Sequence, residues 1–235
     1  MRKSQAGFTL IEIAIVLVII GLLLGGVLKG QELITSARVR NLISTQDGIK
    51  AAYFGFQDRY RALPGDYPGA QAQANIPNMP DATYGGNGDG RIINIGGGAA
   101  EQTIAWMHLS HAGFLTGNFR MASNSEAVAA NNTPTNPYNA FMQIVHDNVY
   151  SVVTGDPAAV IRLNVKTGNQ VPVEIMTEVD RKVDDANAGR GTMRFSVYQG
   201  PGTAAAPTPA NCFTAATGVW LTTTNEVNCG GASLF

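Results

Sequence analysis

The stretch that decides the fold lies at residues 2–30 and reads RKSQAGFTLIEIAIVLVIIGLLLGGVLKG. Over residues 8–28, every residue except Thr9 and Glu12 is apolar or glycine. At about 1.5 Å of rise per residue, a helix of this length covers the roughly 30 Å of a bilayer core. The sequence therefore predicts a membrane-spanning helix over residues 8–28.

The charges that flank this helix predict its orientation. Arg2 and Lys3 precede the apolar run, and positively charged flanks tend to stay in the cytoplasm. The N-terminus is therefore expected in the cytoplasm, with the chain beyond Lys29 on the other side of the membrane. The run is too long for the apolar region of a cleaved secretory signal, which has about 7 to 15 residues. A plain signal anchor and a membrane helix with a functional acid are the alternatives left.

Glu12 favours the second alternative. An ionised acid well inside a membrane helix costs about 2.5 to 3.5 kcal/mol, and somewhat less near its edge. An acid in this position needs a cationic partner. Arg2, Lys3 and any newly made N-terminal amine are the nearby cations of the chain, and a second copy of the chain can equally supply one.

The motif GFTLIE at residues 7–12 follows a short basic leader and precedes an apolar helix. It resembles the N-terminus of type IV prepilins and type II secretion pseudopilins, over about the first thirty residues. The resemblance implies that a membrane peptidase recognises a leader charged at Lys3, cuts between Gly7 and Phe8, and methylates Phe8. It also implies that Glu12 pairs with the N-terminal amine of a neighbouring subunit during filament assembly.

Beyond the membrane, apolar residues at helical spacing predict that the helix continues through residues 29–63 and that its second half packs on a globular domain. Pro64 and Gly65 are expected to end it. The apolar stripe consists of Leu42, Ile49, Tyr53, Phe56, Tyr60 and Leu63. The expected organisation is a cleaved leader at 1–7, a transmembrane helix at 8–28, its continuation at 29–63 and a globular head at 64–235.

The head is expected to be one loop-rich domain, because the chain has 27 Gly and 11 Pro among 235 residues. We predict short helices near 101–112 and 173–185, and exposed loops at 118–137 and 201–211. The predicted fold is α+β and pilin-like, with a long N-terminal helix on an antiparallel β-sheet. Segments rich in β-branched and aromatic residues, which predict its strands, are 148–154, 159–165, 192–198 and 218–224.

Charge and motif content exclude some functions. The residues after Leu63 carry 8 Lys and Arg against 13 Asp and Glu, a net charge of about −5. This charge argues against a nucleic-acid partner, since surfaces that bind nucleic acids are basic. The sequence has no nucleophile elbow, phosphate loop or metal-hydrolase helix motif, so we expect no enzymatic activity.

Cys212 and Cys229 are the two cysteines of the chain. A disulfide between them fits both their number and their expected location outside the cytoplasm. Two buried free thiols are the alternative. The resemblance agrees with the disulfide, because a C-terminal disulfide loop is common among pilins.

The segment YGGNGDGRI at 84–92 raises the question of a metal. Asn87 and Asp89, followed by Gly90, match the middle of a calcium-binding loop, but Gly85 and Gly96 stand where two acidic ligands should be. Asn-Gly and Asp-Gly are also the strongest turn dipeptides. We expect a turn, with calcium as the alternative and no other cofactor; some pseudopilins bind calcium.

Two further groups of residues are not interpreted as binding or catalytic sites. His108 and His111 lie one helical turn apart, and we interpret them as helix-surface histidines rather than a zinc pair. The acidic run EVDRKVDD at 178–185 is interpreted as the solvated face of a helix.

The expected function is a structural subunit of a type IV pilus or pilus-like filament. Its expected partners are itself and other pilins, the prepilin peptidase, the inner-membrane assembly platform, and membrane lipid before assembly. The resemblance implies a single-pass inner-membrane precursor that later joins a periplasmic or cell-surface filament. The alternatives are a type II secretion pseudopilin, a minor pilin whose loop at 118–137 recognises a surface or DNA, and an anchored periplasmic enzyme.

Overall fold

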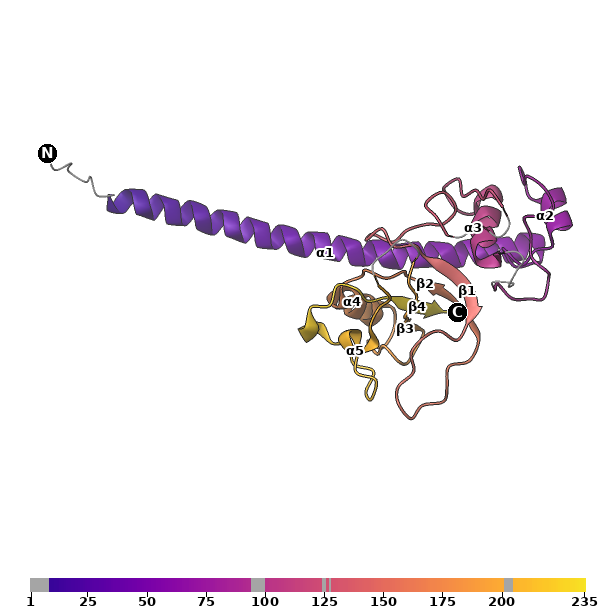
Figure 1. Cartoon of the computed structure of the whole chain (residues 1–235). Helices are drawn as coiled ribbons and strands as arrows, with labels where there is room; N and C mark the ends of the chain where they lie inside the picture. Colours follow the sequence, from indigo (N-terminus) through magenta and orange to yellow (C-terminus); the bar gives the residue numbers. More distant parts are fainter. Residues whose placement is uncertain (1–8, 94–99, 124–125, 127, 201–204) are drawn as a thin grey trace. The chain divides into compact units, whose positions relative to one another are not determined.

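The structure, a computed structural model, describes residues 9–93, 100–123, 126, 128–200 and 205–235 (Figure 1). The chain divides into two compact units, residues Met1–Arg38 and Val39–Phe235. Its elements in chain order are α1 (Leu10–Tyr60), α2 (Gly69–Asn75), α3 (Glu101–His111), β1 (Gln143–Asp147), β2 (Arg162–Lys166), α4 (Val173–Val183), β3 (Met193–Phe195), α5 (Pro209–Cys212), the 3-10 helix η1 (Thr222–Thr224) and β4 (Gly231–Leu234).

The described part of the first unit consists of helix α1 up to Arg38, preceded by Thr9. Every side chain from Thr9 to Lys29 is exposed. By length and composition, α1 is apolar enough to cross a membrane. The long N-terminal helix predicted from the sequence is confirmed. It ends at Tyr60 rather than Leu63, because the next residue, Arg61, has a left-handed backbone with φ 53°.

In the second unit, the remainder of α1 buries one stripe of side chains in two apolar cores. Val39 and Leu42 belong to a core formed with α4, β3 and the C-terminal segment. Further along, Ile49, Tyr53 and Phe56 belong to a core formed with α3, β1 and β2. The predicted apolar stripe is therefore confirmed, and one helix contributes to both cores.

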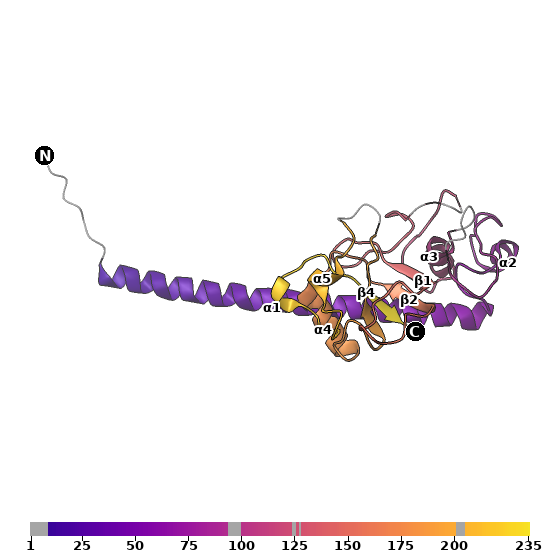
Figure 2. The same ribbon diagram turned by 60° about the horizontal axis from the view of Figure 1, so that its bottom comes forward.

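The four strands form one antiparallel sheet in the order β1-β2-β4-β3. α3 packs against β1 and α4 against β3 (Figures 1 and 2). The last strand, β4, is central and all four of its residues are buried. The predicted α+β fold, with its antiparallel sheet and the helices near 101–112 and 173–185, is confirmed.

Two of the strand predictions are wrong. The segment at 148–154 follows β1 as irregular chain, and Lys166 Nζ and Ser196 Oγ donate to the Val149 carbonyl, at 2.6 and 3.1 Å. Side chains thus supply donors that a neighbouring strand would otherwise supply. The segment at 218–224 forms only isolated bridges before turning into η1. The central strand β4 was not predicted, because its sequence, GASL, is short and made mostly of small residues.

Two phenylalanines on α1, Phe54 and Phe56, lie two residues apart and allow a test of this packing. Phe56 is 0% exposed and Phe54 is 52% exposed. Phe56→Ala should lower the free energy of unfolding by about 3 to 5 kcal/mol, because it leaves a cavity in the first core. Phe54→Ala, the matched control, should cost less than about 1 kcal/mol. The measurement is chemical unfolding of the protein in detergent, followed by near-ultraviolet circular dichroism; equal costs would contradict the burial assigned to Phe56.

Candidate functional site

The first turn of α1 is closed by a reciprocal pair of hydrogen bonds. Glu12 Oε2 accepts from the Thr9 backbone N–H and from Thr9 Oγ1, each at 2.7 Å, and the Glu12 N–H donates to Thr9 Oγ1 at 3.3 Å. Thr9 precedes the first helical residue and Glu12 is the third residue of the helix, so the pair forms a capping box. Two backbone N–H groups that the helix itself leaves without a partner are satisfied in this way.

The sequence analysis missed this role of Glu12, although its signal was readable. A Thr followed three residues later by Glu, directly before an apolar run, is the usual pattern of a capping box. Glu12 therefore has a partner within its own chain. Within the described residues, only Oε2 of its carboxylate accepts hydrogen bonds.

The residues expected to take part in processing, Lys3, Gly7 and Phe8, lie outside the described residues. Cleavage between Gly7 and Phe8 and methylation of Phe8 therefore stay predictions. The capping box lies just beyond the expected cut. It uses the amide of Thr9, which survives cleavage.

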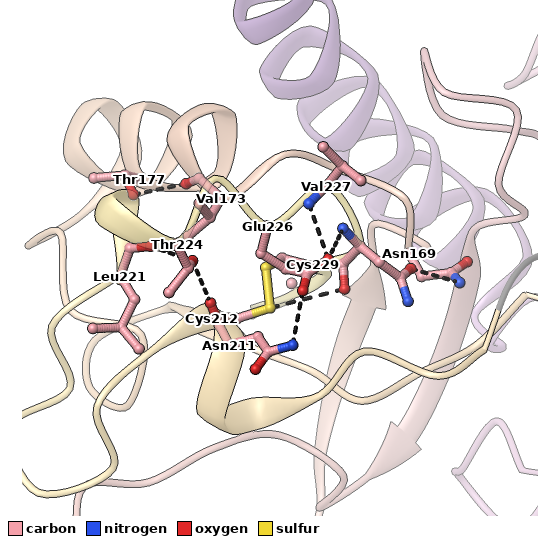
Figure 3. Close-up of a disulfide and its surroundings, with 12 residues drawn as sticks. Asn169, Val173, Thr177, Asn211, Cys212, Leu221, Thr224, Glu226, Val227 and Cys229 are labelled. Atoms are coloured by element: carbon pink, nitrogen blue, oxygen red, sulfur yellow. Dashed lines mark hydrogen bonds between the residues drawn. A yellow bond between two sulfur atoms is a disulfide. The ribbon is translucent and has the colours of Figure 1, made fainter.

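Near the C-terminus, Cys212 and Cys229 form a disulfide (Figure 3). Both cysteines are fully buried, and the alternative of two free thiols is wrong. Hydrogen bonds tie the enclosed segment to α5: Asn211 Nδ2 donates to Glu226 Oε2 at 2.9 Å, and Thr224 Oγ1 donates to the Asn211 carbonyl at 2.8 Å. Cys229 also pairs with Val171, just before α4.

The candidate cation loop is a hydrogen-bonded turn. The Asp89 N–H donates to Asn87 Oδ1 at 3.0 Å, and Asn87 Nδ2 donates to Asp89 Oδ2 at 3.1 Å. Gly88 and Gly90 have positive φ values of 76° and 82°, which glycine adopts without strain. The geometry fits the predicted turn, and a calcium ion held by Asn87 and Asp89 stays a prediction.

Two buried acids, Asp66 and Glu101, hold this turn from outside it. Asp66 accepts hydrogen bonds from the backbone N–H groups of Gly88, Asp89 and Gly90 at 2.7 to 3.0 Å. Glu101 accepts from the N–H groups of Asn87 and Ile93 at 3.1 and 2.9 Å. Burial is the main cause that raises the pKa of both carboxyl groups. The oxygens of both acids are used as hydrogen-bond acceptors, so Asp66 and Glu101 are structural in this arrangement.

His108 is not a surface histidine, which corrects the sequence interpretation. It is fully buried in α3. Its Nδ1 accepts from the Gly65 N–H at 3.0 Å, and its Nε2 lies 2.9 Å from the Tyr84 carbonyl, so that the neutral ring donates there. It therefore links the end of the Pro64–Gly65 turn to the start of the 84–93 loop.

The recognition loop expected at 118–137 is irregular where it is described, but part of it is buried. Asn136 donates from Nδ2 to the Thr167 and Asn169 carbonyls and accepts at Oδ1 from the Tyr138 and Ala140 N–H groups, at 2.8 to 3.1 Å. The polar side chain of Asn136 therefore satisfies internal backbone groups of the head. The prediction of a fully exposed loop is therefore wrong around Asn136.

Residues 2–28 match the family model for the prokaryotic N-terminal methylation motif, which is the prepilin-type cleavage and methylation segment of the type IV pilin family. No curated protein and no solved structure matches the chain. The motif supports a pilin-like or pseudopilin-like precursor with a structural role. It implies assembly with other pilins and processing by the prepilin peptidase, and together with the apolar helix it fits membrane anchoring.

The disulfide should stabilise the head. Closing a loop of 17 residues contributes about 3 kcal/mol in the chain-entropy model. Replacing both cysteines by alanine should lower the free energy of unfolding by about this amount without changing far-ultraviolet circular dichroism. Thiol titration of the unreduced, denatured wild-type protein should detect no free thiol; two thiols per chain would show that the bond does not form.

His108 should make stability depend on pH. Burial lowers its pKa from 6.5 to about 4. Since the unfolded chain takes up this proton more readily, the contribution of His108 is complete above about pH 6.5 and is lost as pH falls toward 4, by up to about 3 kcal/mol. The buried acids Asp66 and Glu101 have the opposite effect, because their pKa values are raised.

A comparison of variants isolates the histidine. His108→Gln should cost more stability at about pH 7.5 than at about pH 4.5, because the protonation penalty disappears with the ring. His111→Gln, on the same helix, should show a smaller difference between the two pH values. The same cost for His108→Gln at both values would contradict a buried neutral ring.

Proposed function

Since its first residues carry the methylation motif of the type IV pilin family, we propose that this chain is a structural subunit of a type IV pilus or pilus-like filament and assembles through its N-terminal helix. The observation that carries the proposal is the combination of this motif with α1. From Leu10 to Leu28 the helix exposes side chains that are all apolar except Glu12, with glycine at three positions. Such a surface suits lipid first and other helices later.

Processing prepares this helix for assembly. The prepilin peptidase cuts the peptide bond between Gly7 and Phe8 and so frees an amine on Phe8, which is then methylated. A positive amine next to a helix N-terminus is unfavourable, because the helix dipole places a partial positive charge there. A carboxylate within reach removes this penalty, and Glu12 is the acid of the first turn.

Glu12 can meet both demands at once. Its Oε2 keeps the capping hydrogen bonds from Thr9, while Oε1 accepts a hydrogen bond from the positively charged Phe8 amine of a neighbouring subunit. The pairing neutralises two charges that are costly in an apolar core, and it fixes how far one helix slides along the next. Before assembly, the capping box supplies partners to the first backbone N–H groups of the helix until the neighbour arrives.

Before assembly, the proposed precursor is a single-pass protein of the inner membrane with its N-terminus in the cytoplasm. Its partners are then lipid, the prepilin peptidase and the inner-membrane assembly platform. After extraction it contacts other pilins in a periplasmic or cell-surface filament. Neither a nucleic-acid partner nor an enzymatic activity is part of the proposal.

The second candidate function is a pseudopilin of a type II secretion system, which builds a short periplasmic filament. The same motif supports both. The length of 235 residues exceeds that of a typical major pseudopilin, which favours a pilin or a minor pilin. A minor pilin that binds a surface or DNA has less support, because the head is acidic and part of the 118–137 loop is used internally.

The experiment that tests the proposal is the intact mass of the protein in sheared-surface and envelope fractions, from cells with and without the prepilin peptidase. A chain that starts at N-methylated Phe8 and is abundant in the sheared fraction is the expected result. The processed chain confined to the envelope would favour a pseudopilin or scarce minor pilin. A chain that still starts at Met1 in peptidase-positive cells would overturn the proposal.

Variants of Glu12 separate its charge from its capping role. Glu12→Gln keeps an oxygen for the capping box, since Gln also serves in this position, but it removes the charge. It should insert into the membrane normally and leave the sheared fraction empty, as should Glu12→Ala. Thr9→Ala, which keeps the charge and loses the Oγ1 bonds, is the matched control and should retain filaments. Normal filaments from Glu12→Gln would refute the charge pairing.

A further inference from the structure

A lysine lies buried on one face of the β-sheet. This face is covered by a third, smaller core, in which Ala159 packs against Tyr150, Ala232 and Leu234. Lys166, the last residue of β2, pairs with Ala232 of β4, and directly paired residues of neighbouring strands share a face. Its side chain is only 1% exposed, although lysine is almost never fully buried without a partner. The groups around its amine therefore decide its role.

The Lys166 amine contacts one carboxylate. Its Nζ donates to Asp147 Oδ1 at 2.9 Å and to the Val149 carbonyl at 2.6 Å, and it lies 5.9 Å from the centre of the Tyr150 ring. Asp147 is the only acid that pairs with this amine among the described residues. Burial lowers the pKa of Lys166, and the carboxylate of Asp147 opposes this shift. The amine therefore loses its proton more readily than a lysine in water does.

Two further N–H groups point at the oxygen that the amine contacts. Asp147 Oδ1 accepts from Asn164 Nδ2 at 2.9 Å and from the Val149 N–H at 3.1 Å. Asn164 is fully buried, and its Nδ2 also donates to the Arg162 carbonyl at 2.9 Å, which fixes the direction of the amide. Donors held in this way stabilise the negative charge that develops on an oxygen when a nucleophile attacks the carbon attached to it. Oδ1 of Asp147 therefore has surroundings that suit an oxyanion.

The amine is also close to the carboxyl carbon of Asp147. Nζ lies 2.9 Å from Oδ1, and Oδ1 is bonded to Cγ at about 1.2 Å, so Nζ lies at most about 4.1 Å from Cγ. Attack begins when the reacting atoms are about 3 to 3.5 Å apart, so a movement of about 1 Å at most is needed. A buried ion pair is costly, and transfer of one proton from Nζ to the carboxylate leaves a neutral amine beside a neutral acid. These are the two forms from which an amide bond is made.

We propose that Lys166 and Asp147 form an intramolecular amide bond, an isopeptide bond, which joins β2 to β1. After the proton transfer, the neutral amine attacks Cγ of Asp147, and Oδ1 carries the negative charge between the N–H groups of Asn164 and Val149. The Cγ–Oδ2 bond then breaks. Oδ2 leaves as water with the transferred proton and a second proton from Nζ, so the step consumes no other reactant. The proton that stays on Nζ keeps the hydrogen bond to the Val149 carbonyl.

The bond removes two charges from a place where charge is costly. The Asp147 side chain is 22% exposed, so the water that forms has a path to solvent. The two residues are 19 positions apart in the chain, and their bond encloses residues 148–165. Like the disulfide, it stabilises the head by restricting the unfolded chain, but it acts on β1, at the edge of the sheet, whereas the disulfide acts near the C-terminus. This inference does not depend on filament assembly.

The first test is the intact mass of the purified full-length protein, measured under denaturing and reducing conditions. The expected mass is one water molecule below the mass calculated from the sequence with the same first residue and N-terminal methylation, because the disulfide is open and the amide bond stays closed. The full calculated mass would overturn the proposal. A mass lower by one ammonia molecule would also overturn it, because it would indicate that an asparagine such as Asn164 has reacted instead.

A tryptic digest locates the bond. Without the bond, trypsin cleaves after Arg162 and after Lys166 and separates residues 121–162 from residues 163–166. With the bond, trypsin does not cleave after Lys166, and residues 121–162 stay joined to residues 163–181 in one branched species that is one water molecule lighter than the two peptides together. A deficit that maps instead to residues 62–91, where Asp89-Gly90 can lose water by closing a ring, would assign the change to another place and overturn the proposal.

Two lysine variants provide the controls. Lys166→Met removes the amine from a side chain that stays unbranched, and it should have the full calculated mass. Lys182→Met, on α4, removes a partly exposed amine that pairs with Glu178, and it should keep the deficit of one water molecule. A deficit that persists in Lys166→Met would contradict the assignment. The branched peptide of the wild type decides the question even where Lys166→Met does not fold, because the masses are measured on denatured protein.

Discussion

The constraint on which this molecule depends is that backbone polar groups need partners where water is scarce. α1 meets it along its length by intrahelical hydrogen bonds and at its start by the Thr9–Glu12 capping box. The same requirement recurs in the head, where loops cover much of the chain. There the partners are buried side chains: Asp66 and Glu101 for the 84–93 loop, and Asn136 for the segment before β1.

In the 84–93 loop, glycines and buried acids act together: the glycines permit the path of the backbone, and the acids accept its hydrogen bonds. The 84–93 loop follows a path that glycine permits at Gly88 and Gly90, and several of its N–H groups point at carboxylates. His108 connects this loop, at the Tyr84 carbonyl, to the Gly65 amide after α1. These interactions stabilise irregular chain without secondary structure, which is how a domain with short strands keeps a defined shape.

Much of this architecture could be predicted from the sequence, but not all of it. Apolar length and helical spacing predicted α1 and its buried stripe, because those patterns report burial directly. The methylation motif could also be recognised, because its residues are contiguous in the sequence. The central strand β4 was not, since Ala232 and Ser233 have weak strand preferences and are placed by β2 and β3. The burial of His108 and Asp180 could not be predicted either, because their hydrogen-bond partners Gly65 and Trp220 lie 43 and 40 residues away in the chain. The capping box, by contrast, is readable in the sequence as Thr9 followed three residues later by Glu12.

The position of β4 has a consequence for the order in which the head forms. This strand comes last in the sequence and yet lies between β2 and β3, to which it supplies both inner ladders. Until residues 231–234 are in place, β3 has no partner strand among the described residues, and Cys229, just before β4, reaches Cys212 at nearly the same stage. Folding of the sheet and closure of the disulfide are therefore expected late in the formation of the head and close together in time.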